Sequence, residues 1–188
     1  KLFASFASLK AGVIGDVMLD TYMWGRVDRI SPEAPVPVVS LNKKEYRIGG
    51  AGNVALNCQS LGAAVAILSV TGNDTDGLLL GELFESNTID TSYLVKSSNR
   101  RTTSKTRIIS RNQQMMRLDD EITDNLSKED EDKLLEQVRN FIAVEDPDII
   151  IFEDYNKGVL TERVIQEVTE LCRKAGVLTA VDPKRKNF

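Results

Sequence analysis

The sequence predicts an α/β fold, in which a mostly parallel β-sheet lies between two layers of helices. Three observations predict it: short apolar runs recur between turn residues, they alternate with segments that have helical spacing of apolar residues, and the runs stay apolar on both strand faces. Strands of this composition are buried on both sides, as in parallel sheets whose crossover helices cover both faces. We therefore expect a three-layer α/β/α arrangement.

The first half of the chain contains two predicted strands with a helix between them. The first strand covers 13–15 and ends at Asp16. The segment 1–7 before it is too short and too mixed for a secretory signal, and we expect a short amphipathic helix there. The glycine-rich run 49–53 predicts a tight turn that opens a helix, because apolar residues follow it at helical spacing, and the strand 65–70 comes next.

The second half repeats this alternation. The segment 127–142 begins with a capping-box pattern and continues with apolar residues at helical spacing. A continuous apolar strand follows at 149–152. The segment 161–176 predicts a second helix, with a threonine cap at its start and a glycine at its end, and 177–181 is the next strand. Two parallel strands joined by a helix are the expected result.

Two segments do not fit the alternation, and we expect them to form a small β lid at the edge of the sheet. The segment 21–41 contains three prolines, which favour an edge strand or an irregular strand. The segment 91–119 predicts a hairpin that turns at 111–114. Nothing indicates a linker or an internal repeat, so residues 1–188 are expected to form a single domain.

Composition restricts the classes of function. The chain has no histidine, which excludes histidine bases and histidine metal ligands, and its net charge of −4 argues against general nucleic-acid binding. No apolar run approaches the roughly 20 residues of a membrane helix. Cys58 and Cys172 fall on apolar faces of predicted helices, as buried thiols do in a reducing compartment. We expect a cytoplasmic protein without nucleic-acid or membrane partners.

Polar residues follow each predicted strand. In open α/β sheets ligands bind beyond the carboxyl ends of the strands. A single Asp there is usually a turn or cap residue, but several beside a glycine-rich helix start favour a site for a polyhydroxylated small molecule, because carboxylates accept hydrogen bonds from hydroxyls. The residues concerned are Asp16 and Asp20, 72–74, 153–158 and 182–184.

A run of basic residues suggests that this molecule carries a phosphate. No acidic residue occurs from 91 to 118, and the next residue is Asp119. Lys105 and Arg107 are two apart and share one face of their predicted strand, and Arg117 returns on the partner strand. Together they could hold one dianion. The alternative, a solvated charged face, stays open.

The motifs resemble a known family. The run 49–72 resembles the amino-terminal signature of the ribokinase-like (PfkB) carbohydrate kinases, and 15–20 resembles the family's first-strand motif. Further segments resemble the heptose 7-phosphate kinase domain of the bifunctional ADP-heptose synthases, and these are 29–38, 110–114, 154–158 and 182–184.

The resemblance implies an ATP-dependent transfer of a phosphoryl group to the anomeric hydroxyl of D-glycero-D-manno-heptose 7-phosphate, on the route to the lipopolysaccharide core. It implies that Asp20 and Asn53 bind sugar hydroxyls, that Gly49 and Gly50 pack against the sugar, and that Asp16 is their neighbour. It also implies that the lid joins two copies as a homodimer.

Further assignments rest partly on charge. We predict that four cations bind the 7-phosphate, that Asp154 contacts the substrate, and that two residues face the nucleotide phosphates. The cations are Lys105, Arg107, Arg117 and Lys157, and the last two residues are Asp182 and Lys184.

One departure from the family is large. The Asp-Thr-x-Gly-Ala-Gly-Asp type motif, which supplies the anion hole and the catalytic base, does not occur in this sequence, nor does the Asn-x-x-Glu motif near magnesium. The carboxyl-terminal part of the fold is expected to be absent. ATP and Mg²⁺ would serve the complete enzyme, and this chain should neither bind them tightly nor be active alone.

Two alternatives remain open. One is a ribokinase-like kinase of another sugar or a nucleoside, and the other is a non-catalytic module that binds a sugar phosphate. A dinucleotide-binding oxidoreductase is disfavoured, because the first turn lacks its glycine fingerprint.

Overall fold

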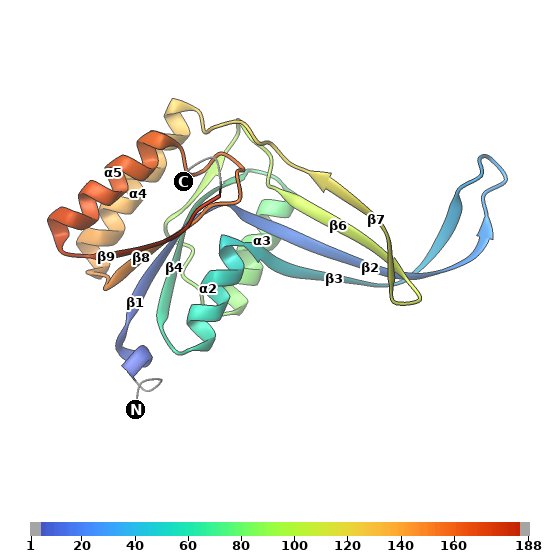
Figure 1. The fold of residues 1–188 in the computed structure, drawn as a ribbon, viewed down its shortest axis with the longest axis horizontal. Helices are drawn as coiled ribbons and strands as arrows, with labels where there is room; N and C mark the ends of the chain where they lie inside the picture. The colour runs from blue at the N-terminus through green and yellow to red at the C-terminus, as the bar shows by residue number, and fades with distance from the viewer. Residues whose placement is uncertain (1–4, 185–188) are drawn as a thin grey trace.

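The central element is a five-stranded parallel sheet with the order β5-β4-β1-β8-β9 (Figure 1). The structure is a computed structural model, and it describes residues 5–184. All neighbouring strands are parallel, as predicted. The strands are β1 (Lys10–Gly15), β4 (Ala64–Gly72), β5 (Leu94–Ser97), β8 (Ile149–Glu153) and β9 (Leu178–Asp182).

Helices cover both faces of this sheet, which confirms the three-layer arrangement. On one face α2 (Ala51–Ser60) and α3 (Thr75–Ser86) pack around Phe84 and Ile67. On the other face α4 (Lys128–Glu145) and α5 (Glu162–Ala175) enclose a second core. Burial of these apolar faces holds the layers together, at about 25 cal/mol for each Å² removed from water.

The predicted helix ends are confirmed by their caps. The Ser127 hydroxyl accepts a hydrogen bond from the Asp130 N–H at 3.2 Å, and the Thr161 hydroxyl accepts one from the Val164 N–H at 3.2 Å. Gly176 ends α5 with a φ of 74°, a conformation that favours glycine. Local sequence therefore sets where α4 and α5 begin and where α5 ends.

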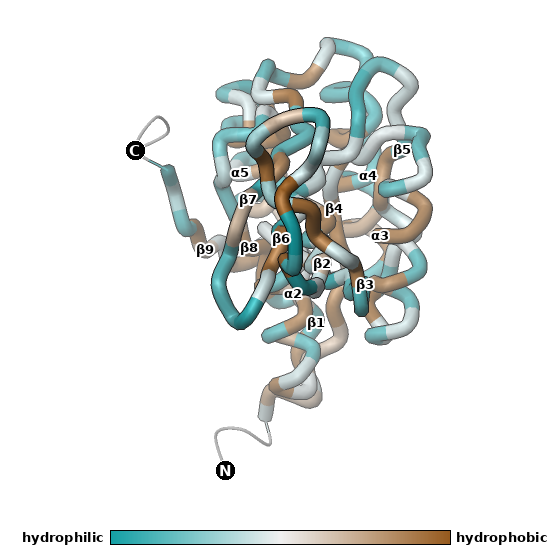
Figure 2. Tube along the Cα trace, turned by 90° about the vertical axis from the view of Figure 1, so that its right-hand side faces the viewer, coloured by the Kyte–Doolittle hydropathy of each residue, from teal (hydrophilic) through white to brown (hydrophobic). Residues whose placement is uncertain are grey.

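A second sheet of four strands forms the lid, with the order β3-β2-β6-β7. It extends away from the body of the molecule (Figure 1). Hydrophilic and hydrophobic residues mix along its strands, whereas the central strands are mostly hydrophobic (Figure 2). The strands are β2 (Val17–Ile30), β3 (Pro37–Gly50), β6 (Ser104–Ser110) and β7 (Gln113–Asp120).

The lid extends beyond the predicted segment 21–41, because β2 starts at Val17 and β3 ends at Gly50. The expectation of an edge or irregular strand is confirmed, since β3 is an edge strand and the register between β2 and β3 is irregular at two places. β2 pairs with β3 on one side and, up to Gly25, with β6 on the other. The prolines do not interrupt it, because two of them lie in the turn before β3 and Pro37 is the first residue of β3. Proline is tolerated at the first position of a strand, where its missing N–H costs no ladder bond.

The limits of the second lid segment also change. Of 91–119, the part that contains β5 belongs to the central sheet, where β5 pairs with β4. The hairpin turns over two residues, Arg111 and Asn112, which have φ values of 50° and 65°. Helix α3 was not predicted. The helix expected in 1–7 is a single 3-10 turn, Phe6–Ser8, and residues 1–4 of that prediction lie outside the described residues.

Asp74 ties the lid to the body. Its carboxylate caps α3 by accepting the Gly77 N–H at 2.8 Å, and it also accepts the Thr102 N–H at 2.8 Å, just before β6. Burial would raise the pKa of Asp74, but these N–H groups outweigh it and hold the pKa below its ordinary value. The ionised carboxylate therefore stabilises the folded state.

We expect Asp74→Ala to lower the free energy of unfolding by about 2 kcal/mol at neutral pH, because it removes a helix cap and leaves a second N–H unpaired. A lowered folded-state pKa contributes stability above the unfolded pKa, which is lost as the pH falls through the folded value. In urea unfolding near pH 2, the wild type and Asp74→Ala should therefore differ less in their free energy of unfolding than at neutral pH. Asn73→Ala, at an exposed neighbour, is the control, and an equal loss there would contradict the role given to Asp74.

Candidate functional site

The glycine-rich turn lies where the lid joins the body. β3 ends at Gly50, α2 begins at the next residue, and the Ala51 N–H donates to the Asp16 carbonyl at 2.9 Å. Gly50 has a φ of 59°, and a Cβ there would lie 2.2 Å from that same carbonyl oxygen. Only glycine fits this position. The turn thus brings the end of β3 against the junction between β1 and β2.

Asp20 lies directly over this turn. It follows Met18, which pairs with Gly49 in the ladder between β2 and β3, and a Cβ on Gly49 would lie 2.6 Å from Asp20 Oδ2. The Asp20 side chain is 17% exposed, so a ligand can reach it. Asn53 is exposed on the first turn of α2. A carboxylate, glycine backbone and an exposed amide are therefore placed around the start of α2.

Asp16 does not open into this site, which corrects its predicted role as a neighbour of the sugar. It is 1% exposed, and its carboxylate accepts the N–H groups of Tyr155, Lys157 and Val159 at 2.8, 3.1 and 3.0 Å. Burial raises the pKa of Asp16, and these hydrogen bonds offset part of the rise. Asp16 thus fixes the loop after β8 and contacts no open surface.

We expect Asp16→Asn to lower the free energy of unfolding by roughly 2–3 kcal/mol, because an amide in either orientation turns its NH₂ toward a backbone N–H that loses its acceptor. Urea unfolding measures the change. Asp182→Asn, at an exposed position, should change it by less than about 0.5 kcal/mol. If the two variants unfold alike, Asp16 does not hold this loop.

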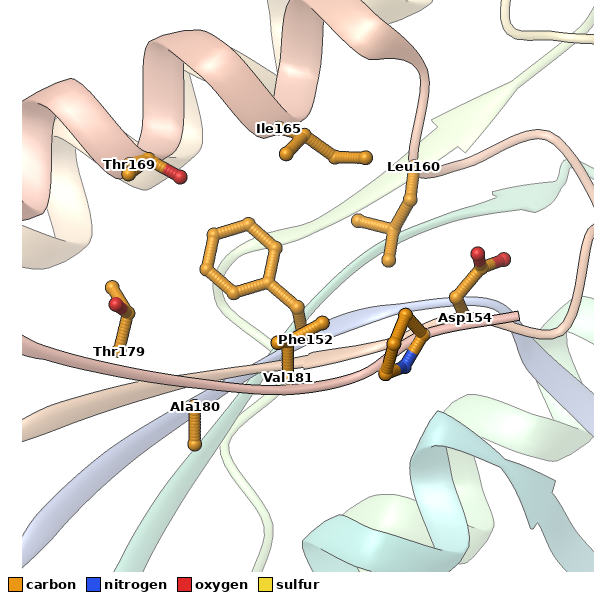
Figure 3. Close-up of a pocket in the computed structure, with 9 residues that line it drawn as sticks. Phe152, Asp154, Leu160, Ile165, Thr169, Thr179, Ala180 and Val181 are labelled. Carbon is orange, nitrogen blue, oxygen red and sulfur yellow. The ribbon is translucent and has the colours of Figure 1, made fainter. Parts of the chain in front are cut away.

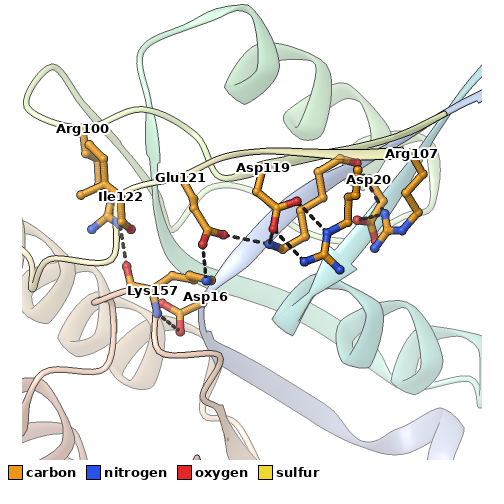
Figure 4. Close-up of polar contacts among 10 residues, drawn as sticks. Asp16, Asp20, Arg100, Arg107, Asp119, Glu121, Ile122 and Lys157 are labelled. Atoms are coloured by element: carbon orange, nitrogen blue, oxygen red, sulfur yellow. Dashed lines mark hydrogen bonds and ion pairs between the residues drawn. The ribbon is translucent and has the colours of Figure 1, made fainter. Parts of the chain in front are cut away.

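Three of the predicted phosphate-binding cations lie on one face of the lid and Lys157 meets them from the loop after β8, but each has a carboxylate partner (Figure 4). Arg107 contacts Asp20 at 2.6 Å. Three other cations share two carboxylates that sequence reasoning did not include. The pairs are Lys105–Asp119 at 2.9 Å, Lys105–Glu121 at 2.8 Å, Arg117–Asp119 at 2.8 Å and Lys157–Glu121 at 2.7 Å.

Electrostatics keeps this network ionised. Burial would lower the pKa of Lys105, but its hydrogen bonds to Glu121 and Asp119 outweigh burial and raise it. Burial would likewise raise the pKa of Glu121, which Lys105 and Lys157 instead hold below its ordinary value. Because Lys157 belongs to the body and Lys105 to the lid, Glu121 links the two.

Arg100 is a third residue that sequence reasoning missed. Its guanidinium donates to the carbonyl of Lys157 at 2.7 Å and to that of Ile122 at 3.4 Å, so it joins the loop after β8 to the segment after β7 (Figure 4). Asp16 accepts the Lys157 N–H, so that both the N–H and the carbonyl of Lys157 are bonded to side chains. For Asp119 and Glu121 the sequence held a signal, the acidic run that directly follows the basic one. Arg100 binds backbone carbonyls, which the sequence does not indicate.

The remaining predicted residues lie apart from the lid network. Asp154 is 4% exposed and accepts the N–H groups of Asn156 at 2.8 Å and Lys184 at 3.2 Å, so it orders the turn after β8. Asp182 and Lys184 are exposed at the end of β9, and Lys184 Nζ lies 5.1 Å from the centre of the Tyr155 ring.

Asp154 also borders an apolar groove of about 450 Å³ between α5 and the last two strands (Figure 3). Phe152, Leu160 and Ile165 line it, and Leu178 and Val181 on β9 are 68% and 64% exposed. The groove has little of the polar character that a sugar needs. The sugar site at Asp20 and the glycine turn stays a prediction.

Among residues 5–184, no group of three or more His, Cys, Asp or Glu side chains is arranged to hold a metal ion. None of the helices in the same range is both long and apolar enough to cross a membrane.

Comparison with known proteins identifies the family. The profile of the pfkB family of carbohydrate kinases matches residues 9–188, which is almost the whole chain. This chain belongs to the pfkB family. Two relatives are each named Bifunctional protein HldE, one from Geotalea uraniireducens (strain Rf4), 43% identical, and one from Geobacter sulfurreducens, 42% identical. Each covers 100% of this chain, which spans only 38% of their length.

Solved structures of pfkB kinases share the fold. Ribokinase from Arabidopsis thaliana, complexed with ribose and ATP, has 18% identity and a TM-score of 0.63, over 93% of this chain and 53% of its own. Phosphofructokinase-2 from Escherichia coli, in complex with fructose-6-phosphate, has 17% identity and a TM-score of 0.65, over 93% and 54%. The ribokinase-like fold class predicted from the sequence is thus confirmed.

Proposed function

We propose that the protein carrying this pfkB chain transfers the γ-phosphoryl group of ATP to the anomeric hydroxyl of D-glycero-D-manno-heptose 7-phosphate. The product would be used in the synthesis of ADP-heptose for the lipopolysaccharide core. The observation that carries this proposal is the 43% identity to a Bifunctional protein HldE across the whole chain. The motifs that resemble heptose 7-phosphate kinases support the same substrate.

The site supports a sugar that carries a phosphate. Asp20 and Asn53 offer oxygen and amide groups to hydroxyls, and Gly49 and Gly50 allow the sugar to approach the backbone. The lid and the loop after β8 together bring four cations near Asp20, against three carboxylates, so the cluster can accept one more anion. A neutral sugar needs no such cluster. We propose that the phosphate end of the substrate lies here.

In the complete enzyme ATP would supply the phosphoryl group, and Mg²⁺ would neutralise charge in the transition state. The family's glycine-rich motif with its catalytic base does not occur in these 188 residues. We therefore propose that this chain binds and orients the sugar but does not catalyse transfer alone. Its cytoplasmic location stays a prediction.

A phosphotransfer assay tests the proposal. The full-length protein is incubated with ATP, Mg²⁺ and single sugars, and ³¹P NMR identifies the product. We expect heptose 7-phosphate to gain a second phosphate at its anomeric carbon. Faster turnover of an unphosphorylated sugar or a nucleoside, or no turnover of heptose 7-phosphate, would contradict the substrate. Turnover by residues 1–188 alone would contradict the proposal that this chain does not catalyse transfer by itself.

We also propose that two copies pair through the lid. The face opposite the ion network carries exposed apolar side chains, with Tyr46, Met116 and Leu118 36%, 54% and 52% exposed. Tyr46 and Leu118 lie at the two ends of one row of the ladder, which runs through Thr21 and Thr106. Exposed apolar side chains grouped on one face are typical of contacts between chains.

Leu118→Glu should therefore convert a dimer into a monomer, because it places a charge in the apolar row. Sedimentation equilibrium of the full-length protein measures the mass. Val144→Glu is the matched control, since Val144 is 71% exposed at the end of α4, away from the lid. A wild-type monomer, or a Leu118→Glu dimer, would contradict pairing through this face.

A further inference from the structure

The four cations of the network differ in which carboxylate holds them. Lys105 lies between Asp119 and Glu121, with its side chain 14% exposed. Asp119 holds Arg117 with two bonds, from Nε at 2.8 Å and from Nη2 at 3.0 Å. Lys157 is paired with Glu121. These three cations are thus held by Asp119 and Glu121, and none of them is bonded to Asp20.

Arg107 is arranged differently. Its bonds to described residues, to Asp20 Oδ1 at 2.6 Å and to the Lys105 carbonyl at 3.4 Å, both leave from Nη1. The N–H groups on Nε and Nη2 therefore remain available to a ligand. The guanidinium also lies 5.1 Å from the centre of the Tyr22 ring, which restricts its orientation.

Asp20 likewise uses only one of its two carboxylate oxygens to bind Arg107. Its Oδ1 accepts from Arg107, while Oδ2 is the oxygen that lies over Gly49. Because the two oxygens of a carboxylate accept hydrogen bonds separately, a sugar hydroxyl can bind Oδ2 while Arg107 stays on Oδ1. The pair therefore presents an acceptor on one side and donors on the other, at a fixed separation.

We propose that Arg107 is the residue that selects a phosphorylated sugar, with Asp20 Oδ2 binding a hydroxyl and the Nε and Nη2 groups of Arg107 binding the phosphate ester of the same molecule. This inference rests on the proposed function and narrows its four cations to one. The other three keep the lid in place. An unphosphorylated sugar can bind Asp20 but leaves the Arg107 donors unused.

The test compares kcat/KM for a sugar phosphate and for the same sugar without phosphate, in the full-length protein and its variants. Arg107→Gln should lower kcat/KM for heptose 7-phosphate about 10- to 100-fold, through KM, and leave that for heptose within about 3-fold. Arg107→Lys should restore part of the loss. Arg47→Gln is the control, because Arg47 lies 4.5 Å from the same Tyr22 ring but pairs with Glu45.

The outcomes separate the inference from the proposed function. If the enzyme prefers another sugar phosphate, the proposed substrate is wrong, and the ratio is measured with that pair instead. The inference is overturned if the wild-type enzyme has the same kcat/KM for a sugar phosphate and for the same sugar without phosphate, or if it binds no sugar. It is also overturned by an Arg107→Gln variant that loses both activities equally, as a purely structural residue would, or by a loss of selectivity in Arg117→Gln instead.

Discussion

Replacing Gly50 with alanine should lower the free energy of unfolding by roughly 2–4 kcal/mol. A Cβ at this position would lie 2.2 Å from the Asp16 carbonyl oxygen, and the φ of 59° is one that alanine rarely adopts. The clash cannot relax cheaply, because the contacted atom is backbone at the junction of β1 and β2. Urea unfolding of the full-length protein measures the loss.

Gly81→Ala is the matched control for this substitution. Gly81 lies inside α3, and a Cβ there meets nothing within 4 Å. Alanine should therefore stabilise the helix by about 0.5–1 kcal/mol. Equal effects of the two substitutions would mean that the turn tolerates a side chain, and the geometry given for the start of α2 would be wrong.

The second large effect is expected for Asp20→Ala, in the phosphotransfer reaction of the full-length protein. Loss of a carboxylate that binds a sugar hydroxyl lowers transition-state stabilisation by about 3 kcal/mol, which corresponds to about a 100-fold fall in kcat/KM. The unpaired Arg107 adds to the loss. Steady-state kinetics with heptose 7-phosphate measures it, alongside unfolding to show that the variant is folded.

Asp28→Ala serves as its control, since Asp28 lies exposed on the same strand β2 beyond the site. Its kcat/KM should stay within about 2-fold of the wild type. If Asp20→Ala retains wild-type kinetics while it remains folded, the sugar does not bind at this carboxylate.

Four of the five strands of the central sheet were predicted, because their signals are local, whereas β5 was assigned to the lid. Apolar runs such as 149–152 and caps such as Thr161 depend on neighbours along the chain, and both are confirmed. Helix α3 was missed although Asp74 is a cap of the same kind. The lid was harder, since the path of β2 depends on pairing with β6, which lies far away in sequence.

The site was predicted only in part, for a related reason. The type of a residue indicates which chemistry it can perform, but its partners decide whether it is available. Asp16 and Asp20 look alike in the sequence, yet one is 1% exposed with backbone partners and the other has an oxygen over Gly49. Likewise, the pairing of Lys105 with Glu121 follows from the path of the chain after β7.

The central claim is that a sugar phosphate binds between the glycine turn and the lid. A crystal structure of the full-length protein with heptose 7-phosphate tests it most directly. We predict sugar hydroxyls within hydrogen-bond distance of Asp20 and Asn53, and the phosphate on Nε or Nη2 of Arg107. A sugar bound elsewhere, or a phosphate held away from the lid, would contradict the account.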